Sequence, residues 1–133
     1  MPFGMDELEW DELVDSAVAE LVSVAEARAT ITYGEFATRL RRRPPNRTLD
    51  PHRGPMPSLL AAASSRVREE DPDAPLVSAL VYRAAENLPG EGFFKLAARV
   101  GYPVGDKLEF WARHVAAVHA WAAQRGERGT APP

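Results

Sequence analysis

The 133-residue sequence contains no cysteine. Disulfides, zinc–thiolate sites, iron–sulfur clusters and thiol nucleophiles are therefore excluded, and the absence fits the reducing cytoplasm, where we expect the protein to reside. No uninterrupted apolar run reaches the roughly 18 residues that a membrane-spanning helix needs. The first fifteen residues are acidic and amphipathic rather than cationic, so we expect neither a signal peptide nor a membrane partner.

The motifs of common catalytic and cofactor sites are missing as well. There is no Walker loop, and the Gly-Glu-Gly stretch at residues 90–92 is too short for a dinucleotide fingerprint. His114 and His119 are five residues apart, whereas ligands on one helical face are three or four apart, so we expect satisfied or solvated histidines. No serine stands in a nucleophile-elbow context. We predict a protein that is not an enzyme and carries no cofactor or metal.

The residues that are present are typical of one globular domain. They are 45% hydrophobic and 26% charged, and the chain is long enough for a core that needs no metal or disulfide. We predict a single domain over residues 1–126. Residues 127–133 are polar and end in proline, and we expect them to form a disordered tail.

A long amphipathic helix is predicted near each end of the domain. Apolar residues recur at three-and-four spacing over about residues 6–28, where Asp6 and Glu9 have capping-box spacing. The same period follows Asp106 and continues to a glycine stop at Gly126. We expect these two helices to pack around a central unit.

The central unit begins with a strongly specified helix start. Thr32 and Glu35 have the spacing of a capping box, and Ile31 and Phe36 have that of a hydrophobic staple. A helix of about ten residues is predicted from this start to just before Pro44, because the residue that precedes a proline is disfavoured in a helix.

A proline-rich stretch follows this helix. Residues 44–57 contain five prolines and no periodicity, and they are predicted to form a loop. A third, short helix is expected to open at Pro57 or Ser58 and to end before residue 71.

The remaining part of the central unit is predicted to contain a strand. Residues 75–83 are a short apolar run of branched and aromatic side chains, which is typical of a strand. Residues 86–94 indicate a glycine-rich hairpin turn, in which the choice of strand or loop at Phe93 stays open. Residues 95–101 indicate a short helix closed by glycine.

Charge is strongly segregated along the chain. Residues 1–20 hold seven acidic side chains and no basic one. Residues 39–53 hold one acid and six arginines, namely Arg39, Arg41, Arg42, Arg43, Arg47 and Arg53. Because a guanidinium binds phosphate with two parallel hydrogen bonds, such a cluster suits a nucleic-acid backbone. The alternative is a solvated loop whose arginines pair with the acidic first helix.

The order of helix, capped helix, loop, small-residue helix, strand and glycine turn is that of a winged helix. A more specific likeness to one protein family lies in four segments of this order. They are Ile31–Ala37 (Ile-Thr-Tyr-Gly-Glu-Phe-Ala), the later helix, residues 75–77 (Pro-Leu-Val) and residues 90–93 (Gly-Glu-Gly-Phe). Over about residues 30–94 the chain resembles the carboxy-terminal DNA-binding domain of alkylguanine-DNA alkyltransferases and alkyltransferase-like proteins. In that family a tyrosine assists base flipping, an arginine fills the vacated stack, and a helix of small residues enters the minor groove.

The resemblance implies roles for several residues of this chain. Tyr33 matches the base-flipping tyrosine, although an aromatic residue in a first helical turn also commonly packs against a neighbouring helix. Arg53 and Arg66 are the candidates for the arginine. The small residues suited to close approach are Ala61, Ala62, Ser64 and Ser65. Where the family carries Pro-Cys-His-Arg, residues 78–81 are Ser-Ala-Leu-Val, so alkyl transfer is excluded. The tryptophan typical of the alkyltransferase-like group is also missing, which argues against lesion recognition.

We therefore predict an α+β, mostly helical fold with a winged-helix-like core and long N- and C-terminal helices. The expected function is non-catalytic binding of double-stranded DNA by the arginine-rich loop and the small-residue helix. The residues expected to bind DNA are Tyr33, Arg39, Arg41, Arg42, Arg43, Arg47, Arg53, Ser58, Ser65 and Arg66. The alternative is a protein-interaction module, of the adaptor or immunity type, that uses the acidic first helix or the turn at residues 88–94. The two hypotheses differ in whether the arginines gather beside the third helix or against the acidic helix.

Overall fold

A computed structural model of the protein describes residues 7–43 and 56–130. Helices make up most of these residues, and the sheet they contain is small, so the predicted α+β, mostly helical class is confirmed. In chain order the elements are α1 (Glu7–Glu26), β1 (Ile31–Thr32), α2 (Tyr33–Arg41), α3 (Met56–Glu70), the 3₁₀ helix η2 (Val77–Leu80), β2 (Val81–Tyr82), α4 (Glu91–Arg99) and α5 (Lys107–Thr130).

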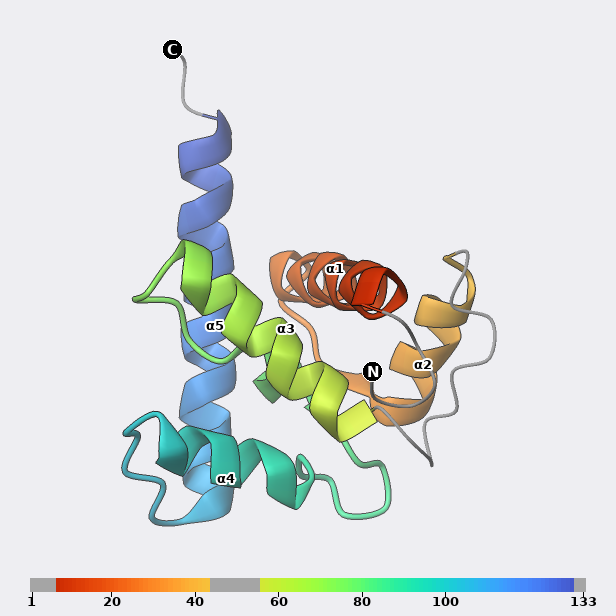
Figure 1. The fold of residues 1–133 in the computed structure, drawn as a ribbon. Coiled ribbons are helices and arrows are strands. Elements are labelled where there is room, and N and C mark those ends of the chain that lie inside the picture. Colours follow the sequence, from red (N-terminus) through yellow and green to blue (C-terminus); the bar gives the residue numbers. More distant parts are fainter. Residues whose placement is uncertain (1–6, 44–55, 131–133) are drawn as a thin grey trace.

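Three helices form the centre of the molecule. α1 packs against α3 and α5, and η2 contacts all three of them. In Figure 1, α5 stands upright behind α3, with α1 towards the top of the view and α4 at the bottom. All residues of η2 are buried, so the chain passes through the middle of the core there. Within the described ranges, no helix combines the length and the apolar character required to cross a membrane.

The helix start predicted at residue 32 is confirmed. Thr32 caps α2, because its side-chain oxygen accepts a hydrogen bond from the backbone N–H of Glu35 over 3.2 Å. Ile31 and Phe36, the two members of the predicted staple, are both buried. α2 ends at Arg41, ahead of the proline-rich stretch, as expected.

α1 agrees with the helix predicted over about residues 6–28, apart from its ends. Its apolar stripe is buried against the core. Beyond the helix, Arg28 takes a left-handed backbone conformation with a φ of 56°, and the N–H of Ala29 donates to the carbonyl oxygen of Val24 over 3.1 Å. This is the geometry of a Schellman-type cap, in which glycine is the usual residue at the left-handed position.

The strand predicted over residues 75–83 is wrong for most of its length. Val77–Leu80 form η2, and only Val81–Tyr82 form a strand, which pairs in parallel with Ile31–Thr32. The physical reason is that nearly the whole run is buried. An apolar run without alternation does not distinguish a buried strand from another buried conformation.

The segments after the strand also differ from the predicted bounds. An isolated antiparallel bridge between Arg83 and Leu88 closes a turn at residues 84–87, which contain no glycine. The glycines of the predicted hairpin turn belong instead to the start of α4, where Gly90 is the N-cap. α4 begins at Glu91, ahead of the predicted start at residue 95, so Phe93 is helical rather than part of a strand or loop. α5 continues through Gly126 to Thr130, because a glycine inside a helix costs only about 1 kcal/mol. The predicted stop at Gly126 is therefore wrong, and the last three residues of the predicted tail lie outside the described residues.

Both histidines of α5 bond to the backbone of the rest of the molecule. The N–H of Leu76 donates to Nε2 of His114 over 2.8 Å. Nε2 of His119 lies 2.9 Å from the carbonyl oxygen of Ala29. Each histidine therefore has a backbone partner for one of its ring nitrogens, and the two contacts join α5 to the segment before η2 and to the turn before β1.

Candidate functional site

Two arginines predicted to contact DNA are paired with a carboxylate of α1. Nε of Arg43 lies 2.5 Å from Oε2 of Glu20, and a guanidinium nitrogen of Arg39 lies 4.0 Å from Oε1 of the same carboxylate. Arg39 also lies 3.6 Å from Glu35 within α2. The Glu20 side chain is only 13% exposed, so it is less screened by salt than an ordinary surface carboxylate. Both guanidinium groups therefore lie against the acidic helix.

Arg66 belongs to α3, the helix predicted to face DNA, but its side chain contacts α1. Its Nη2 lies 2.5 Å from Oδ1 of Asp11, and its Nη1 lies 2.6 Å from Oδ1 of Asp15. Nη1 also donates to the backbone oxygen of Asp11 over 3.1 Å. The guanidinium thus joins α1 to α3 through three hydrogen bonds.

The remaining residues predicted to bind DNA differ in where they lie and whether the structure describes them. Arg41 and Arg42 are exposed at the end of α2, and Arg41 makes a further contact. Ser58 and Ser65 are exposed on α3, where their separation of seven residues places them on one face. Two more predicted residues lie outside the described ranges, namely Arg47 and Arg53.

Tyr33 packs against Gly90. It is the first residue of α2, and the backbone N–H of Gly90 donates a hydrogen bond to its phenolic oxygen. Burial raises the pKa of the phenol above its ordinary value, and this hydrogen bond opposes the rise. A Cβ at residue 90 would lie 2.8 Å from the phenolic oxygen, so glycine is needed for this close approach. The contact joins α2 to the segment before α4.

The position that matches the cysteine motif of the alkyltransferases is closed. The hydroxyl of Ser64 donates to that of Ser78 over 2.8 Å and accepts from the backbone N–H of Ser78 over 3.1 Å. Both serines are buried, so Ser64 belongs to the core and the expectation that it approaches DNA is wrong. The adjoining cavity, which Tyr33 and Phe93 help to line, measures about 20 Å³. It has room for about one water molecule and is far too small for a nucleobase.

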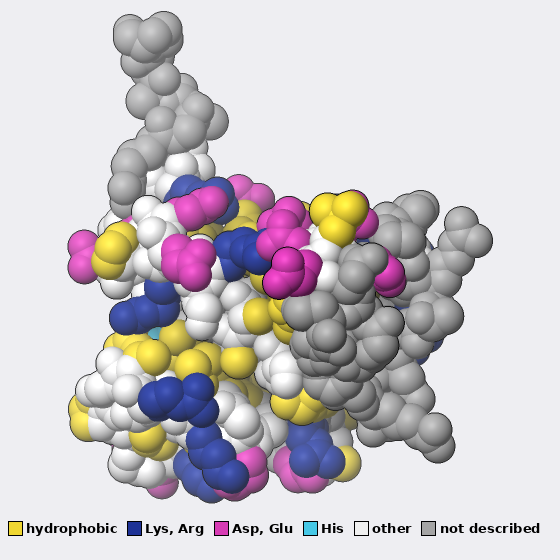
Figure 2. Space-filling view, in the orientation of Figure 1, with side chains coloured by type: hydrophobic (Ala, Val, Ile, Leu, Met, Phe, Trp, Pro, Cys, Tyr) yellow, Lys and Arg dark blue, Asp and Glu magenta, His cyan; other side chains and the backbone are white. Residues whose placement is uncertain are grey.

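The acidic side chains gather on a surface formed by α1 and the end of α3. We call it the acidic surface, and its exposed members are Glu7, Asp11, Glu12, Asp15, Glu69 and Glu70. Figure 2 shows acidic side chains over α1 in the upper part of the view, whereas lysine and arginine side chains gather over α4 in the lower part. The acids of the first segment therefore form an acidic surface, whereas the cations that gather on this face belong to α4 rather than to the arginine-rich segment at residues 39–53.

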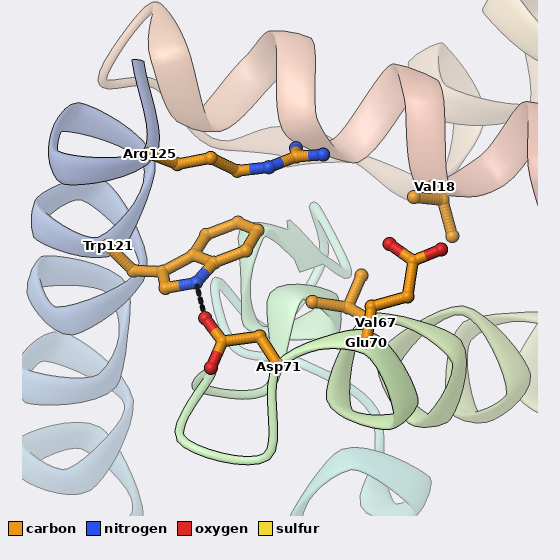
Figure 3. A pocket seen from close by; sticks show the side chains of 6 residues that line it. All are labelled: Val18, Val67, Glu70, Asp71, Trp121 and Arg125. Carbon is orange, nitrogen blue, oxygen red and sulfur yellow. Dashed lines mark hydrogen bonds between the residues drawn. The ribbon is translucent and has the colours of Figure 1, made fainter. Parts of the chain in front are cut away.

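Two hollows lie along α5 beside the acidic surface, and we call them together the α5 groove. The first measures about 370 Å³ and is lined by Val18, Val67, Glu70, Asp71, Trp121 and Arg125 (Figure 3). The second measures about 530 Å³, shares Asp71 and Trp121 with the first, and is also lined by Asp73, Pro75, Tyr102, His114 and Gln124, among others. Nε1–H of Trp121 donates to Oδ2 of Asp71 over 3.0 Å, so this hydrogen bond borders both hollows.

The sequence analysis missed the α5 groove. It assigned no binding role to Asp71, Asp73 or Trp121. One local signal was present, since Trp121 and Arg125 are four residues apart on a helix, and the guanidinium carbon lies 5.5 Å from the ring centre. No local pattern places the end of α3 beside α5.

Comparison of the chain with known protein families, with curated proteins and with solved structures finds no match. The resemblance of residues 30–94 to alkyltransferase domains therefore stays a prediction. The function has to follow from the chemistry of the surfaces described above.

Proposed function

We propose that the protein is a non-catalytic protein-interaction module that binds a basic partner through the acidic surface. The observation that carries the proposal is the pairing of Arg39, Arg43 and Arg66 with carboxylates of α1. These arginines lie against the acidic helix rather than free beside α3. They are therefore poorly placed to neutralise the phosphates of a nucleic acid.

The balance of charge on α1 supports the same proposal. The helix carries seven acidic side chains and no basic one, and its ion pairs with Arg39, Arg43 and Arg66 use the carboxylates of Asp11, Asp15 and Glu20. Glu12 is exposed and makes no ion pair with any residue that the structure describes. A surface with this excess attracts a basic protein and repels a phosphate backbone, and it acts mainly on the rate of association.

Titration of fluorescein-labelled octalysine, followed by anisotropy, tests the proposal with a defined probe. We expect binding at low ionic strength that weakens as salt is added, because exposed charges are screened. Glu12→Lys should weaken binding by about three- to tenfold, a typical effect of reversing one interfacial charge. Glu26→Lys is the matched control, because it makes the same change in net charge at the opposite end of α1.

Thermal unfolding of both variants verifies that they are folded. Equal weakening by the two substitutions would mean that net charge alone attracts the probe, and it would refute the acidic surface as the binding site. Undetectable binding of octalysine at low ionic strength would refute the proposal outright.

Binding of double-stranded DNA is the second candidate, and one observation favours it. α3 exposes Ser58 and Ser65, and the residues between them are alanines and leucines apart from the buried Ser64, so this face carries no charge. α4, which contacts α3, exposes Lys95 and Arg99. A small-residue helix beside cations suits a winged-helix-like core that approaches a DNA groove.

A labelled duplex of about 20 base pairs in the same anisotropy assay separates the two candidates. If the second candidate holds, affinity should fall steeply with salt and drop about tenfold when Arg41, Arg42 and Arg43 are all replaced by alanine. Arg113→Ala is the control, because this arginine pairs with Glu109 on α5. Undetectable duplex binding, or an affinity unchanged by the triple substitution, would exclude DNA as the partner.

A further inference from the structure

We infer that the α5 groove receives an extended, basic segment of a partner protein. The inference rests on the proposed function, and it adds the place where the partner lies and the chemistry that recognises it. The occupant would put an arginine or lysine side chain into the first hollow and its backbone across the second.

The charged walls of the groove favour a cation. Figure 3 shows the guanidinium of Arg125 and the carboxylate of Glu70 on opposite sides of the first hollow, with Asp71 below them beside Trp121. Glu70 is exposed, and its carboxylate makes no hydrogen bond or ion pair with the residues that the structure describes. Asp73 lines the second hollow, and Arg68 brings a second guanidinium beside it, because it donates to the carbonyl oxygen of Ala74 and contacts Tyr102. Three carboxylates therefore face two guanidinium groups among the described residues. The groove therefore keeps a negative potential that attracts a basic side chain.

The floor of the first hollow suits the apolar part of such a side chain. Val67 and Trp121 are largely buried there, and Val18 lies beside them. The methylene groups of lysine and arginine pack along apolar surfaces while their charged ends reach a carboxylate. Arg125 already does this within the chain, since its guanidinium lies over the ring of Trp121. A partner arginine that reaches Glu70 would lie beside this pair.

A second, independent feature of the groove indicates a hydrogen-bond acceptor as part of the ligand. His114 lines the second hollow and is only 5% exposed. Because its Nε2 accepts a hydrogen bond from Leu76, the neutral ring carries its proton on Nδ1. Burial lowers the pKa of the ring to about 4, which keeps it neutral at pH 7. No described residue accepts from Nδ1, and a buried donor without an acceptor is costly.

Together the two features select a peptide among the possible cationic ligands. The backbone of an extended segment supplies a carbonyl oxygen for Nδ1–H of His114, and its basic side chain supplies the cation for Glu70. A polyamine or a metal ion would satisfy the carboxylates but brings no acceptor to the histidine. A nucleic acid would bring phosphates towards three carboxylates, which repel them.

Nuclear magnetic resonance of the ¹⁵N-labelled full chain, titrated with a peptide of four arginine–glycine repeats, tests the inference. We expect the indole N–H signal of Trp121 and the ring signals of His114 to shift with the same saturation curve. The double variant Glu70→Gln, Asp73→Asn should bind the peptide about tenfold more weakly. Glu26→Gln, at an exposed acid outside both the acidic surface and the two hollows, should change the affinity by less than about twofold. Spermine should bind at least about tenfold more weakly than the peptide.

Three results would overturn the inference: signals of Trp121 and His114 that do not move at saturation, equal weakening by the double variant and by Glu26→Gln, or equal affinity for spermine and the peptide. If the groove signals stay unmoved while Glu12→Lys still weakens peptide binding, the proposed function stands and only the groove is wrong as the site. If Glu12→Lys and Glu26→Lys weaken peptide binding equally while Glu70→Gln, Asp73→Asn weakens it about tenfold, the acidic surface is wrong as the site and the groove stands.

Discussion

Because Tyr33 lies so close to Gly90, a methyl group added at residue 90 would overlap the phenol, and the energetic cost of this overlap can be measured. In Gly90→Ala, the new Cβ would lie 2.8 Å from the phenolic oxygen of Tyr33 and 3.7 Å from Cδ of Arg83. The first distance is shorter than these atoms tolerate, so the phenol must move and its hydrogen bond from the N–H of residue 90 is lost or lengthened. Losing that bond costs about 1 kcal/mol, and adjusting the packed neighbours costs about 1 kcal/mol more.

A double-mutant cycle separates the overlap from the other consequences of the added methyl group. Gly90 is the N-cap of α4 and has an ordinary extended backbone, with φ −68° and ψ 166°, so alanine fits it without backbone strain. Alanine caps a helix less well than glycine, and it also restricts the unfolded chain, and these effects of less than about 1 kcal/mol oppose each other. Both are the same when Tyr33 is replaced by phenylalanine.

We expect Gly90→Ala to lower the free energy of unfolding by about 2 kcal/mol in the wild-type background and by less than about 0.5 kcal/mol in Tyr33→Phe. Urea unfolding of the four proteins, followed by far-ultraviolet circular dichroism, measures the difference. In thermal unfolding, a coupling of this size corresponds to several degrees in Tm. An equal cost in the two backgrounds would refute the account of the contact between Tyr33 and Gly90.

Three further predictions concern buried polar groups and ion pairs. The pKa of His114 in the folded protein, about 4, lies below its ordinary value of 6.5, so the unfolded chain binds more protons between these pH values. The free energy of unfolding should therefore lose up to about 3 kcal/mol from this group as pH falls from 7 to 4, and His114→Gln should remove that part of the slope in urea titrations across pH. Ser64→Ala should cost about 2 kcal/mol and Ser78→Ala about 1 kcal/mol in urea unfolding, because only the first leaves a buried backbone N–H without its acceptor. Arg66→Ala should lower stability by about 1 kcal/mol or less, with a smaller loss in high salt, whereas Arg42→Ala should leave Tm unchanged.

Elements specified by neighbouring residues could be predicted from the sequence. The start of α2 depends on a cap and a staple that lie within six residues of each other, and both are present. The stripe of α1 follows from the helical period alone. The run at residues 76–81 could not be assigned in this way, because its conformation depends on burial by α1, α3 and α5 together.

The candidate site was only partly predictable for a related reason. The excess of acid in the first twenty residues and of arginine after residue 38 is visible in the composition of each segment. Which arginines pair with α1 is not visible, since Arg66 and Asp11 are 55 residues apart in the chain. The α5 groove likewise brings Asp71 to Trp121 across 50 residues. Contacts of this range depend on how the helices pack rather than on any local pattern.

The left-handed arginine that follows α1 has a consequence for how this protein can change. An L side chain at a φ of 56° crowds its own backbone at a cost of about 1 kcal/mol, which glycine avoids. Arg28 is exposed and lies on neither of the surfaces considered for binding. Replacing Arg28 by glycine would therefore raise the free energy of unfolding. This gain in stability would compensate for destabilising substitutions elsewhere while a binding surface is evolved towards a new partner.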